Sequence, residues 1–171
     1  MLFTPFHMGP GIFIKVLLQG SFSLVIFGWA QLLMDIQPLV VLLTDNGQLH
    51  GFSHTYIGAS LIAVLATISG KYLADYVFRF LSIYRKETPL ITTWAVTFSS
   101  SFIGTFSHVI LDSVMHGDMK PFYPLPFQNK ILEIISLNQL HLFCIFSGII
   151  GAVLYYISQL FYQKNSKRNN S

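Results

Sequence analysis

The sequence gathers imidazole and carboxylate side chains into a few short segments of an otherwise apolar chain. The most informative segment contains His108, Asp112 and His116, each four residues from the next. On an α-helix, residues at this spacing lie on one face, one above the other. Imidazole and carboxylate groups in that arrangement can bind one metal ion. The segment therefore predicts a metal site, with a polar cavity that holds no ion as the alternative.

Three further positions carry the same kinds of side chain. His50 and His54 repeat the four-residue spacing directly before an uncharged run, so we expect them at the end of a helix. Asp35 ends the first apolar stretch, where a carboxylate opposes the helix dipole and a bound cation would remove the conflict. His7 lies shortly before the expected start of the first helix. Two histidine pairs at one membrane depth would favour a shared metal site.

The elements that position these residues must suit a very apolar chain. Of 171 residues, 53% are hydrophobic and 10% are charged, with a mean hydropathy of +0.58. Soluble domains contain about 25% charged residues. The composition predicts an integral membrane protein with membrane lipids as neighbours and no nucleic-acid partner. It also excludes a disordered chain and, with Cys144 as the single cysteine, a disulfide-stabilised secreted domain.

Uncharged runs locate the helices that cross the membrane, because a helical span requires about 20 mostly apolar residues. They predict three transmembrane helices, over residues 55–81, 91–115 and 139–162. The fold class is therefore expected to be all-α, a polytopic membrane helical bundle. We expect a single domain over residues 1–163, followed by a polar cytoplasmic tail over 164–171.

The first apolar stretch, residues 10–34, is either one further span or a re-entrant helical hairpin. Gln19, Gly20 and Ser21 interrupt its middle, which favours a turn between two short helices. On one straight helix His7 and Asp35 would lie about 42 Å apart, at opposite faces of the bilayer. A hairpin returns both residues to one face, so we predict the re-entrant arrangement.

Basic residues predict the orientation of the helices. They lie in the loop at 82–90, just before it and in the C-terminal tail, and the positive-inside rule places both regions on the cytoplasmic side. The histidine and aspartate segments then lie at the exterior side of the cell (inner) membrane. The basic residues that carry this prediction are Arg79, Arg85, Lys86, Lys164, Lys167 and Arg168.

The order of these motifs resembles the YdjM-like family, which is described as membrane-bound metal-dependent hydrolases. The resemblance spans roughly residues 4–145 and includes an early histidine, an aspartate that closes the first hairpin, a His-Gly-x-x-His-Thr element and a His-x3-Asp element. The family is similar in helical layout to zinc-dependent phospholipase C and related single-strand nucleases. The metal ligands that the resemblance implies are His7, Asp35, His50, His54, His108 and Asp112. Many relatives have Asp-x-Asp where this chain has Asp35-Ile-Gln37, which leaves the number of ions open, from one to three.

The resemblance implies a zinc (or similar divalent metal) hydrolase in which metal-activated water attacks a phosphoester or a lipid-linked substrate. Asp118 and His116 are then the candidate catalytic residues, with Asp118 as a general base or as a partner that orients a histidine. The aromatic segment 121–127 is expected either to cover the site or to form an interfacial aromatic belt. A non-catalytic metal-binding membrane protein and a divalent-metal or proton carrier remain alternatives.

Overall fold

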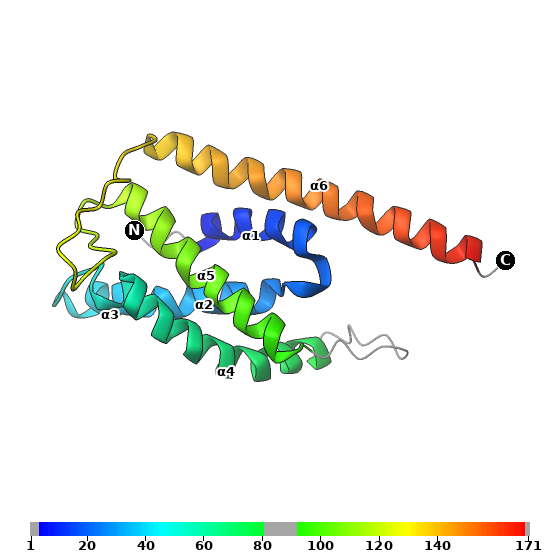
Figure 1. The fold of residues 1–171 in the computed structure, drawn as a ribbon, viewed down its shortest axis with the longest axis horizontal. Coiled ribbons are helices and arrows are strands. Elements are labelled where there is room, and N and C mark those ends of the chain that lie inside the picture. The colour runs from blue at the N-terminus through cyan, green and yellow to red at the C-terminus, as the bar shows by residue number, and fades with distance from the viewer. Residues whose placement is uncertain (1–3, 81–91, 170–171) are drawn as a thin grey trace.

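The structure, a computed structural model, describes residues 4–80 and 92–169, and every regular element in these ranges is a helix (Figure 1). Short 3-10 turns at Gln19–Ser21 and Phe52–His54 join some of the helices. The helices are α1 (Thr4–Leu18), α2 (Leu24–Met34), α3 (Ile36–Thr44), α4 (Tyr56–Phe80), α5 (Trp94–Met115) and α6 (Leu137–Asn169). The predicted all-α class is confirmed.

Four helical stretches are long and apolar enough to cross a membrane: Leu24–Thr44, Tyr56–Val77, Trp94–Met115 and Leu137–Phe161. The last three correspond to the predicted spans. The first combines α2 and α3 and was not predicted as a span. Large apolar side chains are exposed along all four stretches, as expected of helices that face lipid. These features are consistent with a membrane protein.

The junction between α2 and α3 explains why the sequence suggested a helix end at Asp35. Pro38 has no N–H group to donate to the carbonyl of Met34, so the regular hydrogen-bond pattern breaks there. The helical hydrogen-bond pattern resumes at the next residue, because the N–H of Leu39 donates to the carbonyl of Asp35 over 3.0 Å. Proline is tolerated in the first turn of a helix, where its missing donor has no helical partner. Asp35 thus lies inside an apolar helical stretch.

The chain reverses direction between α1 and α2 (Figure 1). Lys15 stabilises the turn, since its Nζ donates to the carbonyls of Gln19 and Phe22, each over 2.6 Å. Gln19 adopts a positive φ of 42°, and Gly20 faces open space. The turn lies at the residues where the sequence predicted one, and it brings the start of α1 and the end of α2 towards the same region.

The remaining helices pack closely where small residues meet. α5 lies against α2 and α4, and α6 lies mainly along α1 (Figure 1). A side chain at Gly151 would collide with the backbone of α1, and one at Gly104 would collide with α2; a side chain at Gly148 would be crowded against Gly9 of α1. Small residues at such crossings let helix backbones approach each other in a membrane. α6 continues to Asn169, so the predicted tail is helical over residues 164–169.

Candidate metal centre

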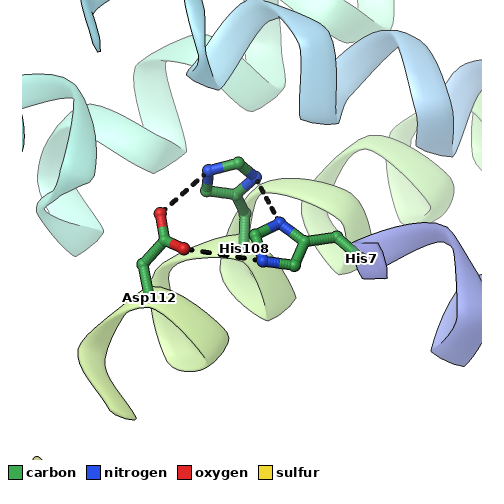
Figure 2. A group of neighbouring side chains, drawn as sticks. All are labelled: His7, His108 and Asp112. Carbon is green, nitrogen blue, oxygen red and sulfur yellow. Dashed lines mark hydrogen bonds and ion pairs between the residues drawn. The ribbon is translucent and has the colours of Figure 1, made fainter. Parts of the chain in front are cut away.

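The carboxylate of Asp112 is the centre of a buried cluster that we call the inner cluster: His7, Asp35, His54, His108 and Asp112. The Nε2 atom of His108 lies 3.1 Å from one carboxylate oxygen of Asp112, and Nε2 of His54 lies 3.4 Å from the same oxygen. Nε2 of His7 lies 3.5 Å from the other oxygen (Figure 2). His108 also approaches the carboxylate of Asp35, at 3.5 Å.

Four separate parts of the chain supply the inner cluster. His7 lies in the first turns of α1, Asp35 at the junction of α2 and α3, and His54 in the 3-10 turn before α4. His108 and Asp112 occupy successive turns of α5. The sequence pattern of α5 makes this approach possible, because the helix presents small buried residues to its neighbours: Ser100, Ser101, Gly104 and Thr105. The hairpin of α1 and α2 is what brings His7 to Asp35.

The inner cluster leaves three buried imidazole nitrogens without hydrogen bonds. These are the Nε2 atoms of His7, His54 and His108, all of which face Asp112. A buried polar atom that lacks a partner costs about 1–3 kcal/mol. A tetrahedral zinc ion with ligands at about 2.0–2.2 Å holds its ligand atoms about 3.3–3.6 Å apart. The N···O separations of 3.1–3.5 Å therefore suit ligands of a metal ion. Within the inner cluster, the groups whose ligand atoms all lie close enough together for one ion are His7, His108 and Asp112, and Asp35, His54 and His108.

Two polar side chains fix the orientation of the inner histidines. The Nδ1 atom of His108 donates to the side-chain oxygen of Gln31, and the amide nitrogen of Gln31 donates to the hydroxyl of Ser107 over 3.3 Å. The Nδ1 atom of His54 lies 2.8 Å from the hydroxyl of Ser53. When Nδ1 carries the proton, Nε2 retains its lone pair. Such outer partners are typical of histidines that bind metals.

A second group, the outer cluster, contains His50, His116 and Asp118. The Nδ1 atom of His50 lies 2.9 Å and 3.0 Å from the two carboxylate oxygens of Asp118, whose side chain is 54% exposed. The rings of His50 and His116 stack, with centroids 4.1 Å apart. Ligand atoms of the three residues lie close enough together to hold an ion.

The two clusters are continuous. The rings of His50 and His54 are in edge contact, with centroids 5.2 Å apart, and His50, His54 and Asp112 form another group with the spacing of a metal site. A path of imidazole rings therefore leads from the buried carboxylate of Asp112 to the exposed carboxylate of Asp118. A cation and a proton acceptor can occupy opposite ends of this arrangement.

Outside the membrane-spanning helices, pKa shifts favour the neutral forms of His54 and His116 and the ionised form of Asp118. Burial lowers the pKa of His54, and the carboxylate of Asp112 offsets part of this effect. Burial and the nearby ring of His50 lower the pKa of His116. Burial opposes ionisation of Asp118, but the hydrogen bond from His50 is strong enough to leave the pKa of that carboxyl below its usual value. Neutral imidazole and ionised carboxylate are the forms that bind metals.

The structure brings all eight sequence-predicted residues into these two clusters, with two local differences from regular helices. α5 ends at Met115, and His116 follows it in an extended conformation, although its N–H still donates to the carbonyl of Asp112 over 2.9 Å. His50 lies in a turn and His54 in the 3-10 turn Phe52–His54, just before α4 begins. The sixth histidine, His141, stacks on Phe6 at a centroid distance of 4.8 Å.

Sequence reasoning missed the residues that orient the histidines. Gln31 is fully buried and contacts His108. The sequence did contain a sign of this role, because Gln31 is a polar residue in an apolar stretch, four residues before Asp35. Ser53 carried no distinguishing signal beyond its position next to His54.

Comparison with known proteins adds no relative: no family model, curated protein or solved structure matches the chain. The case for function depends on the two clusters.

Proposed function

We propose that this protein is an integral membrane metal-dependent hydrolase, with a zinc or similar divalent ion held by the inner cluster. The observation that carries the proposal is the set of three buried Nε2 atoms that face one carboxylate without hydrogen bonds. His7, His54, His108 and Asp112 are the proposed ligands, and Asp35 is a further carboxylate within reach of His108. The resemblance to the YdjM-like family supports the same assignment.

A divalent ion in this site supplies Lewis-acid activation of water and of a substrate oxygen. The outer cluster supplies the proton acceptor. Asp118 is exposed enough to meet water, and its hydrogen bond with His50 holds it beside the inner ligands. His116 stacks on His50 and fixes that ring. The division of roles explains why one aspartate is buried and the other is exposed.

We further propose that the substrate is a phosphoester or lipid-linked compound, and that both clusters open to the exterior face of the cell membrane. Charge placement in the sequence supports this orientation, with the C-terminus in the cytoplasm. The α1–α2 hairpin is then re-entrant, entering and leaving from the exterior side. Labelling of Gly20→Cys by a membrane-impermeant thiol reagent from the exterior would contradict this placement.

Hydrolysis tests the proposal directly. The purified protein is assayed in mild detergent with bis(p-nitrophenyl) phosphate and with phosphatidate, with and without added zinc. Asp112→Asn keeps the shape of the side chain but removes the charge that holds the ion, so activity is expected to disappear. Asp75→Asn is the matched control, because Asp75 lies on α4 beside Lys71 and outside both clusters. Zinc-dependent activity that survives Asp112→Asn at the unchanged rate would contradict the proposal.

A further inference from the structure

A cavity of about 550 Å³ lies in the connection between α5 and α6. Volumes of about 300–1,000 Å³ are typical of sites that bind small molecules. The cavity belongs to neither cluster, and its walls come largely from the aromatic segment that the sequence analysis considered as a cover for the site. Residues that line the cavity include Tyr56, Pro121, Phe122, Phe127, Lys130 and Ile131.

The cavity walls are attached to residues that adjoin the inner cluster. The N–H of Tyr56, two residues after His54, donates to the carbonyl of Pro121 over 2.8 Å. The side chain of Asn129, which also lines the cavity, donates to the carbonyl of Ser113 over 2.7 Å. Ser113 directly follows Asp112 in α5. The cavity is therefore built beside the proposed site and not on a separate part of the bundle.

The lining has an apolar wall and a polar, cationic part. Tyr56 and Phe122 pack with ring centroids 5.5 Å apart, and Phe122 and Phe127 meet edge to face at 6.1 Å. Lys130 is the cationic residue among the lining side chains, next to Gln128 and Asn129. An alkyl chain can pack against the aromatic wall, while an anionic group can pair with the ammonium of Lys130. The loop lies at the ends of two apolar helices, which is where lipid headgroups meet a membrane protein.

We propose that this cavity binds the chain of an anionic phosphate lipid, with the phosphate towards Lys130. The proposal deepens the proposed function and rests on it for the identity of the reacting group. The lipid is the occupant that matches both the aromatic wall and the cation. It would enter from the surrounding membrane through the connection between α5 and α6, whose walls are bonded to Tyr56 and Ser113 beside the inner cluster.

Photo-crosslinking tests the proposal without any need for turnover. The full protein in mild detergent is irradiated with dodecyl phosphate that carries a diazirine in its chain, and the labelled peptides are identified by mass spectrometry. We expect labelling to concentrate on residues 121–131 and to be competed by unlabelled dodecyl phosphate. Ile131→Trp should block it by filling the cavity.

Charge variants sharpen the test. Lys130→Gln should weaken labelling about fivefold, since a lysine near a membrane surface contributes about 1 kcal/mol towards an anionic lipid. Lys120→Gln is the matched control, because Lys120 is exposed in the same connection but does not line the cavity. Uniform labelling of the exposed faces of the helices, unaffected by Lys130→Gln, Ile131→Trp or competitor, would overturn the proposal.

The outcome is separable from that of the proposed function. Crosslinking is repeated with Asp112→Asn, which lacks the proposed metal ligand but retains the cavity. Labelling of this variant with no hydrolysis by the unmodified protein would support the lipid site and contradict the hydrolase. Zinc-dependent hydrolysis of bis(p-nitrophenyl) phosphate without labelling of residues 121–131 would support the hydrolase and contradict the lipid site.

Discussion

The inner and outer clusters contain the same kinds of side chain in different surroundings. In the inner cluster, three histidine nitrogens face a buried carboxylate and have no hydrogen bond. In the outer cluster, His50 already has a hydrogen bond to Asp118, and that carboxylate is 54% exposed. The inner cluster therefore has buried nitrogen atoms available to a cation, whereas His50 and Asp118 of the outer cluster are already bonded to each other.

Under the proposed function, this difference would separate metal binding from proton transfer. A buried, unsatisfied set of ligands gains most from a cation, because the ion replaces missing hydrogen bonds and neutralises a carboxylate. An exposed carboxylate that is oriented by a histidine can exchange protons with water. The predictions below test whether the two clusters differ in this way.

The largest contrast is expected between two histidines. His108→Ala should weaken zinc affinity by more than about a hundredfold, since even outer partners of metal ligands contribute about 10–100-fold. His116→Ala, which removes a ring of the outer cluster that stacks on His50, should change affinity by less than about threefold. Competition with a chromophoric chelator measures both. Equal losses would show that the two clusters form one site.

The next largest effect on zinc affinity is expected from Gln31, which orients His108. Gln31→Leu removes the acceptor for Nδ1 of His108 and should weaken zinc affinity about 10–100-fold. Gln139→Leu is a control, because Gln139 is exposed and bonds only to Ser136 at the start of α6. The same chelator competition applies. If Gln31→Leu keeps the unmodified affinity, the buried amide has no role in orienting His108.

The smallest effect concerns the hairpin that delivers His7 to the inner cluster. Lys15→Met leaves the carbonyls of Gln19 and Phe22 without their donor and should lower the free energy of unfolding by about 1–3 kcal/mol. Lys71→Met is the comparison, since Lys71 donates to one carbonyl, that of Thr92, besides its pair with Asp75 and its contact with the ring of Trp94. Unfolding in mixed micelles measures the difference. Greater destabilisation by Lys71→Met would contradict the proposed importance of the turn.

Much of the fold was predictable because lipid imposes a simple constraint: uncharged runs of sufficient length become helices. The clusters were predictable as well, since ionisable residues are rare in such a chain and must be accommodated. α3 was missed because Asp35 and Pro38 resemble a helix end, although Leu39 continues the hydrogen-bond pattern. The end of α5 at Met115 agrees with the span predicted over residues 91–115, but the spacing of four residues does not show that His116 adopts an extended conformation.

The cavity between α5 and α6 was beyond sequence reasoning for a different reason. Its shape depends on two long-range hydrogen bonds, from Tyr56 to Pro121 and from Asn129 to Ser113, which no local pattern specifies. An irregular connection folds according to such contacts and not according to periodicity. The aromatic residues of the segment were visible in the sequence, but the cavity they form was not.

Elemental analysis of the purified protein tests the central claim most directly. Protein purified in mild detergent should retain about one to three equivalents of zinc or a similar ion. The combined change of His54, His108 and Asp112 to Ala should abolish this retention, whereas the combined change of the outer-cluster residues His116 and Asp118 to Ala should leave at least one equivalent. Metal content that is unaffected by loss of the three inner residues would contradict the account.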